Sequence, residues 1–168
     1  FDEYDVAVPE QDIDAKVMIE ISNAGQIIAA PYLPRLFQML KLLNNEGIFV
    51  SFEAAERAVH LLQFMVNEQS ESPEYLLILN KILCGIPTTV SIRRQLDFSD
   101  HEKTVVEDLI KGMIQNWKAI GSTSVSGFRE TFLQRDGGLF LEDDAWHLTV
   151  HPGTFDMLLD GLPWSFSI

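Results

Sequence analysis

Histidine is the residue type in this chain best suited to catalysis or metal binding, and there are four. His147 and His151 stand four positions apart on a predicted strand, about 13 Å from each other at roughly 3.3 Å per residue, too far to share one metal ion. His60 follows Glu56 by one helical turn, as in a surface charge pair, and His101 lies in a predicted first helical turn, where capping is favoured. We therefore predict no metal site, no cofactor and no catalytic residue, with the four histidines apart and mostly accessible to solvent.

The remaining candidates for chemistry are equally isolated. Cys84 is predicted in the last turn of an apolar helix, whereas a reactive thiolate is favoured at a helix N-terminus or beside a cation, so we predict a buried packing role. A single cysteine also excludes an internal disulfide and fits a reducing compartment. The acidic residues 142–144 and Asp136 lack the alternating ligands and central glycine of a calcium loop. No nucleophile elbow or phosphate-binding glycine loop is present in the sequence, which disfavours a hydrolase or transferase.

Composition excludes further classes of function. The chain has 168 residues and a formal net charge of −13, from 25 acidic and 12 basic residues. Such a balance argues against binding to nucleic acid, which requires clustered Lys and Arg. No apolar run approaches the roughly 20 residues that span a bilayer, so no membrane insertion is expected. The acidity is explained by solubility, with a basic partner surface as the alternative.

The elements that must position these residues follow from hydrophobic periodicity. The pattern predicts an α+β fold, with a helical body of about five helices and a small antiparallel sheet from both chain ends. Residues 1–15 form a predicted acidic arm or linker, and residues 16–168 a single α+β domain. Residues 16–22 alternate as a strand, a turn follows at 23–25, and residues 26–30 are a possible return strand.

Five amphipathic segments predict the helices. They lie near residues 36–43, 51–67, 73–84, 99–120 and 125–134. The second has a polar stripe opposite its apolar side, whereas the third is apolar nearly all round and is predicted at the centre of the domain. The fourth opens with a capping box at Ser99 and Glu102. The third and fourth helices should form a mutually packed, inaccessible core: Leu76, Leu79, Ile82, Leu83, Leu109, Met113 and Trp117.

The end of the chain returns to the period of a strand. Residues 139–141 and 146–150 predict a hairpin around the acidic turn at 142–144, followed by a short helical piece at 155–159. Alternation at Trp164, Phe166 and Ile168 predicts a last strand.

Two polar pairs lie within strongly apolar helical patterns. Asn80-Lys81 and Arg129-Glu130 form either a buried hydrogen-bond network that fixes helix packing or a docking face for another subunit. We favour the network.

Several blocks along the chain resemble the tape measure protein family of contractile injection systems, which are phage-tail-like particles with a tube, a contractile sheath and a baseplate. The blocks are Asn23-Ala24-Gly25 and residues 31–37, 56–63, 79–85, 117–120, 124–135 and 162–167. The resemblance implies a structural protein without catalytic residues or cofactor, related to the ruler that sets tube length. Since the chain begins at Phe1 and a ruler must be long, we expect a fragment that serves as a terminal anchoring part.

The expected partners are other components of the particle: the baseplate hub, the tube or an assembly chaperone. The resemblance implies assembly in the bacterial cytoplasm, or a place inside the tube of a released particle, and leaves the oligomeric state open. Aromatic anchors with a polar rim carry much of the energy of an interface, and a terminal strand can be extended by a partner strand. The candidate partner-binding residues are Arg129, Glu130, Gln134, Arg135, Trp164 and Phe166.

One further class stays open at this point. A small-molecule or protein-binding module would have a pocket between the sheet and the helices, lined by Trp146, Trp164 and Phe128.

Overall fold

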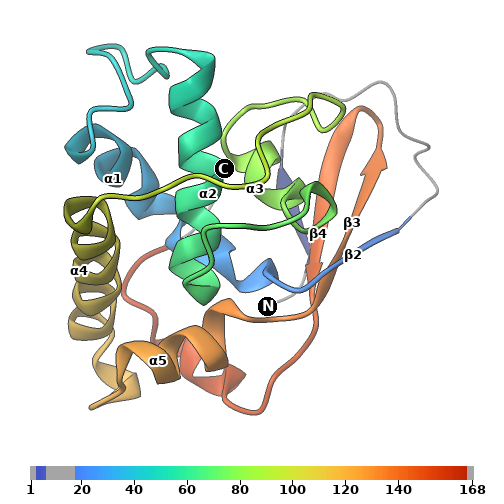
Figure 1. Cartoon of the computed structure of the whole chain (residues 1–168). Coiled ribbons are helices and arrows are strands. Elements are labelled where there is room, and N and C mark those ends of the chain that lie inside the picture. The colour runs from blue at the N-terminus through green and yellow to red at the C-terminus, as the bar shows by residue number, and fades with distance from the viewer. Residues whose placement is uncertain (1–2, 7–17, 166–168) are drawn as a thin grey trace.

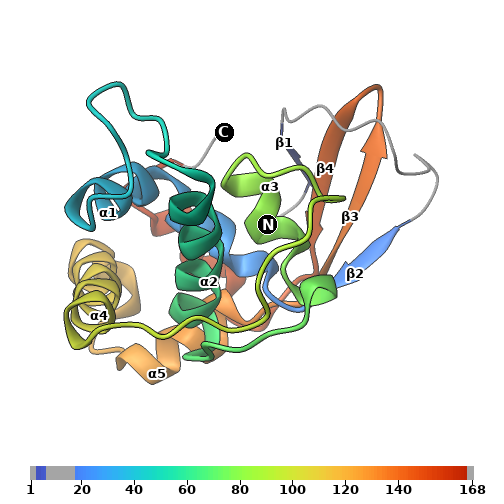
Figure 2. The ribbon, with the colours of Figure 1, turned by 45° about the horizontal axis from the view of Figure 1, so that its top comes forward.

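A layer of helices covers one face of an antiparallel sheet in the computed structural model, which describes residues 3–6 and 18–165 (Figures 1 and 2). The strands are β1 (Glu3–Val6), β2 (Ile19–Ile21), β3 (Gly137–Glu142) and β4 (Ala145–Val150). They lie in the order β1-β4-β3-β2, and each neighbouring pair is antiparallel. The predicted α+β class is confirmed.

The β3–β4 hairpin supplies the inner face of this sheet. Asp143 and Asp144 connect the strands with φ angles of 53° and 60°, as in the two-residue turns that match the twist of a hairpin. Leu139 pairs with Leu148 and Leu141 with Trp146, and all four side chains are buried. The predicted hairpin and its acidic turn are confirmed.

Two predictions for the start of the chain are corrected. Residues 3–6 form a strand paired with β4, where a loosely held arm was predicted; the rest of that arm lies outside the described residues. Residues 26–30 are not a return strand, because they belong to a 3₁₀ helix, η1 (Ala24–Tyr32). Ile27, Ile28 and Ala29 are all buried in η1, and such a short apolar run carries no period that separates a strand from a helix.

Among residues 18–165 the helical layer contains five α-helices: α1 (Leu33–Met39), α2 (Phe52–Asn67), α3 (Ile78–Leu83), α4 (Asp100–Asn116) and α5 (Val125–Phe128). Short 3₁₀ turns are η2 (Glu74–Leu76), η3 (Lys118–Ile120) and η5 (Asp156–Gly161), and one π-helical turn, η4 (Arg129–Leu133), continues α5. The predicted capping box opens α4: the Ser99 hydroxyl accepts from the Glu102 amide, and the Glu102 carboxylate accepts from the Ser99 amide.

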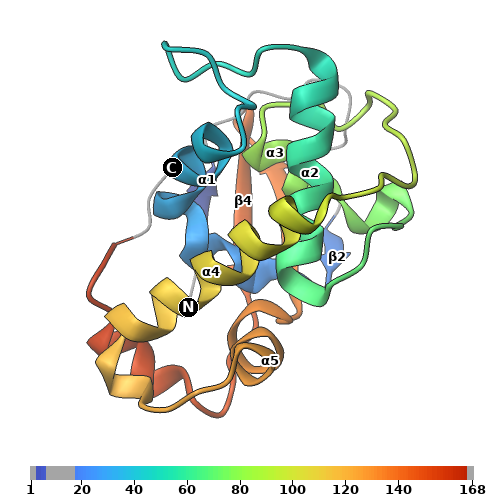
Figure 3. The same ribbon diagram turned by 60° about the vertical axis from the view of Figure 1, so that its left-hand side comes forward.

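Helix α2, and not the 73–84 segment, is the central helix of the domain. It lies between α3 and α4 (Figures 1 and 2), and Figure 3 shows the same layer with α4 in front. Its predicted apolar side is buried from Ala55 onward, but Glu56, His60 and Gln63 of its polar stripe are buried too. The α3 helix is shorter than predicted, because the chain from Glu74 to Leu76 winds as a 3₁₀ turn.

The predicted core is confirmed in part. Leu79, Ile82, Met113 and Trp117 are buried, whereas Leu76, Leu83 and Leu109 are only half-buried. The expected direct packing of the third helix on the fourth is wrong, because α2 stands between α3 and α4 and contacts both (Figures 1 and 2). Trp117 instead packs against Phe128, Phe132 and Trp164.

The segment from Val150 to Ser165 contacts the domain through the side chain of Trp164. The predicted helical piece is present as η5. Trp164 and Ser165 are not in a strand, and residues 166–168 lie outside the described residues. The Trp164 indole donates to the Ile28 carbonyl oxygen at 2.8 Å and packs edge-on against Tyr32.

Candidate docking surface

The histidines do not assemble into a site. His101 and His151 are exposed, and His147 is half-buried and stacked on Phe140 across the hairpin. His60, by contrast, is only 1% exposed, which corrects its predicted surface position. Within residues 3–6 and 18–165, no cluster of three potential ligand residues is placed to hold a metal ion.

Buried His60 and Glu56 hold the segment that joins α3 to α4, which we call the strap (residues 85–99). The Arg93 carbonyl oxygen lies 2.6 Å from His60 Nε2, and the Arg93 amide donates to Glu56 Oε2 at 2.8 Å. The Glu56 carboxylate also faces the Arg93 guanidinium at 3.5 Å. The predicted surface pair of His60 and Glu56 is therefore wrong, because both side chains are used to satisfy the backbone of the strap.

This burial predicts a pH dependence of stability. Desolvation lowers the pKa of His60, although the Arg93 carbonyl and Glu56 act in the opposite direction. In the unfolded chain the imidazole takes up a proton near pH 6.5, while the folded state resists it. The free energy of unfolding should therefore be highest above pH 6.5 and fall as the pH is lowered to 5.5, by at most about 1.4 kcal/mol per pH unit.

The measurement is urea denaturation between pH 5.5 and 7.5. The His60→Gln variant keeps an amide donor for the Arg93 carbonyl and should show a flatter profile. The exposed His101→Gln variant is the control and should follow the parent chain. An unchanged slope in His60→Gln would contradict the assignment.

The favoured network at Asn80 and Lys81 is confirmed. Asn80 lies in a buried cluster of amides, where its Oδ1 accepts from Asn23 Nδ2 and Gln26 Nε2, both at 2.9 Å. Its Nδ2 donates to the Val59 carbonyl oxygen at 3.0 Å, and Gln63 Oε1 accepts from Asn23 Nδ2 at 2.8 Å. The cluster thus joins η1, α2 and α3 through hydrogen bonds within the core.

Lys81 serves the strap. The residue is only 1% exposed. Its ammonium group donates to the Val90 carbonyl oxygen at 2.8 Å and to the Thr88 carbonyl oxygen at 3.3 Å. The Glu74 carboxylate lies 3.4 Å away, and its other oxygen accepts from the Ile92 amide. The positive charge is therefore surrounded by oxygen atoms of the chain itself.

The block around Arg129 caps the C-terminal end of α2. Arg129 Nε donates to the Met65 carbonyl oxygen and Gln134 Nε2 to the Val66 carbonyl oxygen, each at 2.9 Å. Carbonyl groups in the last turn of a helix have no partner within the helix, and a cation there also favours the helix dipole. Arg129 pairs in addition with Glu68 at 2.9 Å.

The other predicted partner-binding residues divide between the interior and the surface. Arg135 is buried, donates to the His151 carbonyl oxygen and pairs with Asp156 at 2.7 Å. The guanidinium of Arg135 lowers the pKa of Asp156. Glu130 and Gln134 are exposed, Trp164 is half-buried, and Phe166 lies outside the described residues.

The aromatic residues expected to line a ligand pocket pack in the interior instead. Trp146 and Phe128 are completely buried in the core, and Trp164 packs against Trp117. Cys84 is buried as predicted, and burial raises the pKa of its thiol. These side chains fill the interior of the domain.

A cluster of exposed apolar side chains forms the surface that sequence reasoning missed. We call it the loop surface: Ile48 and Val50, each 58% exposed, with Phe52 (46%) and Val90 (36%). Phe52 belongs by its spacing to the apolar side of the 51–67 helix, but it is exposed at the first residue of α2. The signal in the sequence is the apolar run of Ile48, Phe49 and Val50 directly after Gly47, which falls between two predicted helices and was assigned to no element.

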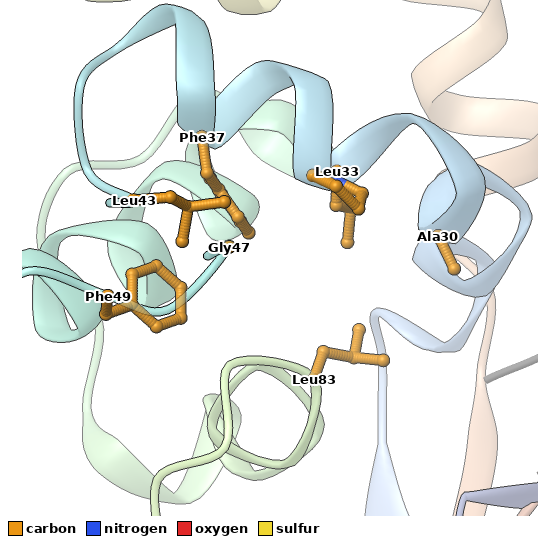
Figure 4. A pocket seen from close by; sticks show the side chains of 8 residues that line it. Ala30, Leu33, Phe37, Leu43, Gly47, Phe49 and Leu83 are labelled. Atoms are coloured by element: carbon orange, nitrogen blue, oxygen red, sulfur yellow. The ribbon is translucent and has the colours of Figure 1, made fainter. Parts of the chain in front are cut away.

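Two depressions meet beside the loop surface, and Gly47 and Phe49 line both. The first, of about 310 Å³, has Phe37, Leu43 and Phe49 on one side and Leu83 on the other (Figure 4). The second, of about 570 Å³, lies between the loop and the strap and includes Ile48, Phe52 and Val90 in its lining. Together they present a hollowed apolar face next to α1.

The loop that carries this face is held in one shape. Leu43 and Phe49 form a β-bridge, and the Asn44 amide donates to the Ile48 carbonyl oxygen at 2.8 Å. The Asn44 side chain accepts from the amides of Glu46 and Ile48, while Gly47 adopts a φ of 77° to close the turn. A fixed loop loses little conformational entropy when a partner binds.

Comparison with known proteins adds the family. A model of the contractile injection system tape measure proteins matches residues 3–168. The chain belongs to this family. No curated protein and no solved structure gives a significant match. As a tape measure protein domain it has a structural role, and other components of the injection system are its partners. In the part of the chain that the structure describes, no helix has the length and apolarity to cross a membrane.

Proposed function

We propose that this tape measure domain anchors the length-determining chain to another component of the particle during assembly. Family membership is the observation that carries the proposal, because a ruler can set a length only if it is attached at a defined point. The polar groups within the helices are also consistent with a structural role. The amide cluster, the Lys81 contacts to the strap and the Arg129 cap of α2 all stabilise the fold.

Residues 16–168 are proposed to act as one unit in this role. One hydrophobic core contains buried residues from η1, the helices and the sheet, including Ile27, Leu61, Met113 and Leu148. Such a body can transmit a pulling force from its surface to the rest of a chain without a hinge in between. The proposed places of action are the cytoplasm during assembly and the inside of the tube.

The predicted partner-binding residues have two different roles in this proposal: some contact the partner, and others position them. Glu130 and Gln134 are exposed and are the members of the block that can touch a partner directly. Arg129 and Arg135 position them, because their guanidinium groups bind α2 and η5. Trp164 and Phe166 remain proposed contact residues at the end of the chain, with Trp164 as a half-buried aromatic anchor.

Deletion of this domain from the parent gene tests the anchoring role. We expect assembly to fail or tubes of uncontrolled length to form, since the ruler has lost its point of attachment. The length distribution of particles in electron micrographs is the measurement, and a strain that carries the restored gene is the control. Particles of normal length in the deletion strain would refute anchoring.

A further inference from the structure

The loop surface is unusual because its apolar groups are exposed on a rigid loop beside two hollows. Large contiguous apolar patches on a folded protein often mark a place where another molecule binds. No described part of the chain covers Ile48, Val50 or Phe52. The depressions next to these side chains offer places where apolar groups of a partner can be enclosed.

Charge decides between the possible occupants. The chain carries a formal net charge of −13, so two copies repel each other at long range. At the loop itself, Glu46 and Glu53 are exposed at the two ends of the 46–53 stretch. The basic residue nearest to this stretch in the sequence on its N-terminal side is Lys41, which is also exposed. The ion pairs among the described residues do not include these two carboxylates. An anionic lipid surface is disfavoured for the same reason as a second copy.

We propose that the loop surface binds a basic amphipathic segment of another protein of the particle, with apolar side chains in the two depressions and Lys or Arg beside Glu46 and Glu53. This inference rests on the anchoring function and names the surface and the chemistry of the partner. Opposite charge steers the segment to the domain and sets its orientation, while the enclosed apolar side chains supply most of the affinity.

A designed probe tests the chemistry directly on the 168-residue chain. The probe is a fluorescent peptide of about 14 residues, roughly four helical turns, with leucines on one face and lysines on the other. Two matched peptides serve as controls: one replaces the leucines by serine, and the other replaces the lysines by glutamate. We expect binding of the leucine–lysine peptide alone, measured by fluorescence anisotropy, and weaker binding at high salt.

Variants locate the binding on the surface. Ile48→Ser/Val50→Ser removes two exposed groups and should keep the melting temperature while weakening binding about tenfold or more. Glu46→Gln/Glu53→Gln should weaken it less and reduce its salt dependence. Tyr75→Ser/Met157→Ser, at residues 69% and 73% exposed elsewhere, is the control and should bind like the parent chain.

Four outcomes would contradict the proposed binding of a basic amphipathic segment. Equal binding of the glutamate peptide would remove the charge argument, and unchanged binding by Ile48→Ser/Val50→Ser would place the site elsewhere. Self-association in sedimentation that this variant abolishes would assign the surface to a second copy. Binding to phosphatidylcholine–phosphatidylglycerol vesicles that the variant abolishes would assign it to lipid.

The same variant in the parent gene separates this inference from the anchoring function. We expect particle-length defects from both the domain deletion and Ile48→Ser/Val50→Ser. A defect from the deletion with normal particles from the variant would refute the loop surface and leave anchoring standing. Normal particles from both would refute anchoring itself.

Discussion

The Gly25→Ala variant should lose at least about 3 kcal/mol of stability, an exceptionally large effect for the addition of one methyl group. A Cβ atom at Gly25 would lie 1.7 Å from the Phe132 carbonyl oxygen and 2.9 Å from Leu133 Cα. Both are backbone atoms of the π-helical turn η4, so no side-chain rotation relieves the clash. The Ala24 amide donates to the Arg135 carbonyl oxygen at 2.9 Å, which holds the two segments together at this point.

Urea denaturation followed by circular dichroism measures the loss. Gly112→Ala is the matched control, because a Cβ at that position in α4 meets nothing within 4 Å. The control should stabilise the protein by up to about 1 kcal/mol, since alanine has the higher helix propensity. A Gly25→Ala variant as stable as the parent chain would show that η1 and η4 do not approach this closely.

The Asn80→Asp variant should be destabilised by about 3 kcal/mol or more at pH 7, although its side chain has nearly the same shape. Asn80 is completely buried, and its Nδ2 donates to the Val59 carbonyl oxygen. One oxygen of a carboxylate there would keep the donors Asn23 and Gln26, but the other oxygen would replace Nδ2 and face the Val59 and Gln63 oxygen atoms. The cost is that of burying a charge among neutral amides, together with the loss of the hydrogen bond to the Val59 carbonyl oxygen.

The pH profile identifies this cause. Burial disfavours the charged form, so the pKa of the new carboxyl group should be raised in the folded state above the ordinary value of about 3.9. The penalty relative to the parent chain should therefore be smallest below pH 4 and grow as the pH rises. Exposed Asn45→Asp is the control and should cost little. A penalty that does not vary with pH would exclude a buried charge as its origin.

Local rules predicted the elements whose ends are set by a few neighbouring residues. The capping box at Ser99 and Glu102, the hairpin turn at Asp143 and Asp144 and the packing role of Cys84 all depend on short-range chemistry. Each was therefore readable from a few consecutive positions.

Positions decided by distant segments could not be predicted in this way. The polar stripe of α2 follows the pattern of a solvated face, yet Glu56 and His60 are buried by a strap more than thirty residues further along the chain. In the same way, a docking role stayed open for Arg129 beside the favoured buried network, because the carbonyl group that it caps belongs to α2. The loop surface was missed because exposure depends on what the rest of the chain leaves uncovered.

The strand order has a consequence for how the chain is made. Ile19 pairs with Leu139, so β2 has no described partner strand until almost the whole domain has left the ribosome. Contacts between residues so far apart in sequence form slowly, because closing a long loop costs entropy before any pairing energy is gained. Helices such as α2 and α4 can form earlier, but their inner sides then lack the sheet. A chain truncated before Gly137 would leave this core open, so completed synthesis is a condition for the domain to fold.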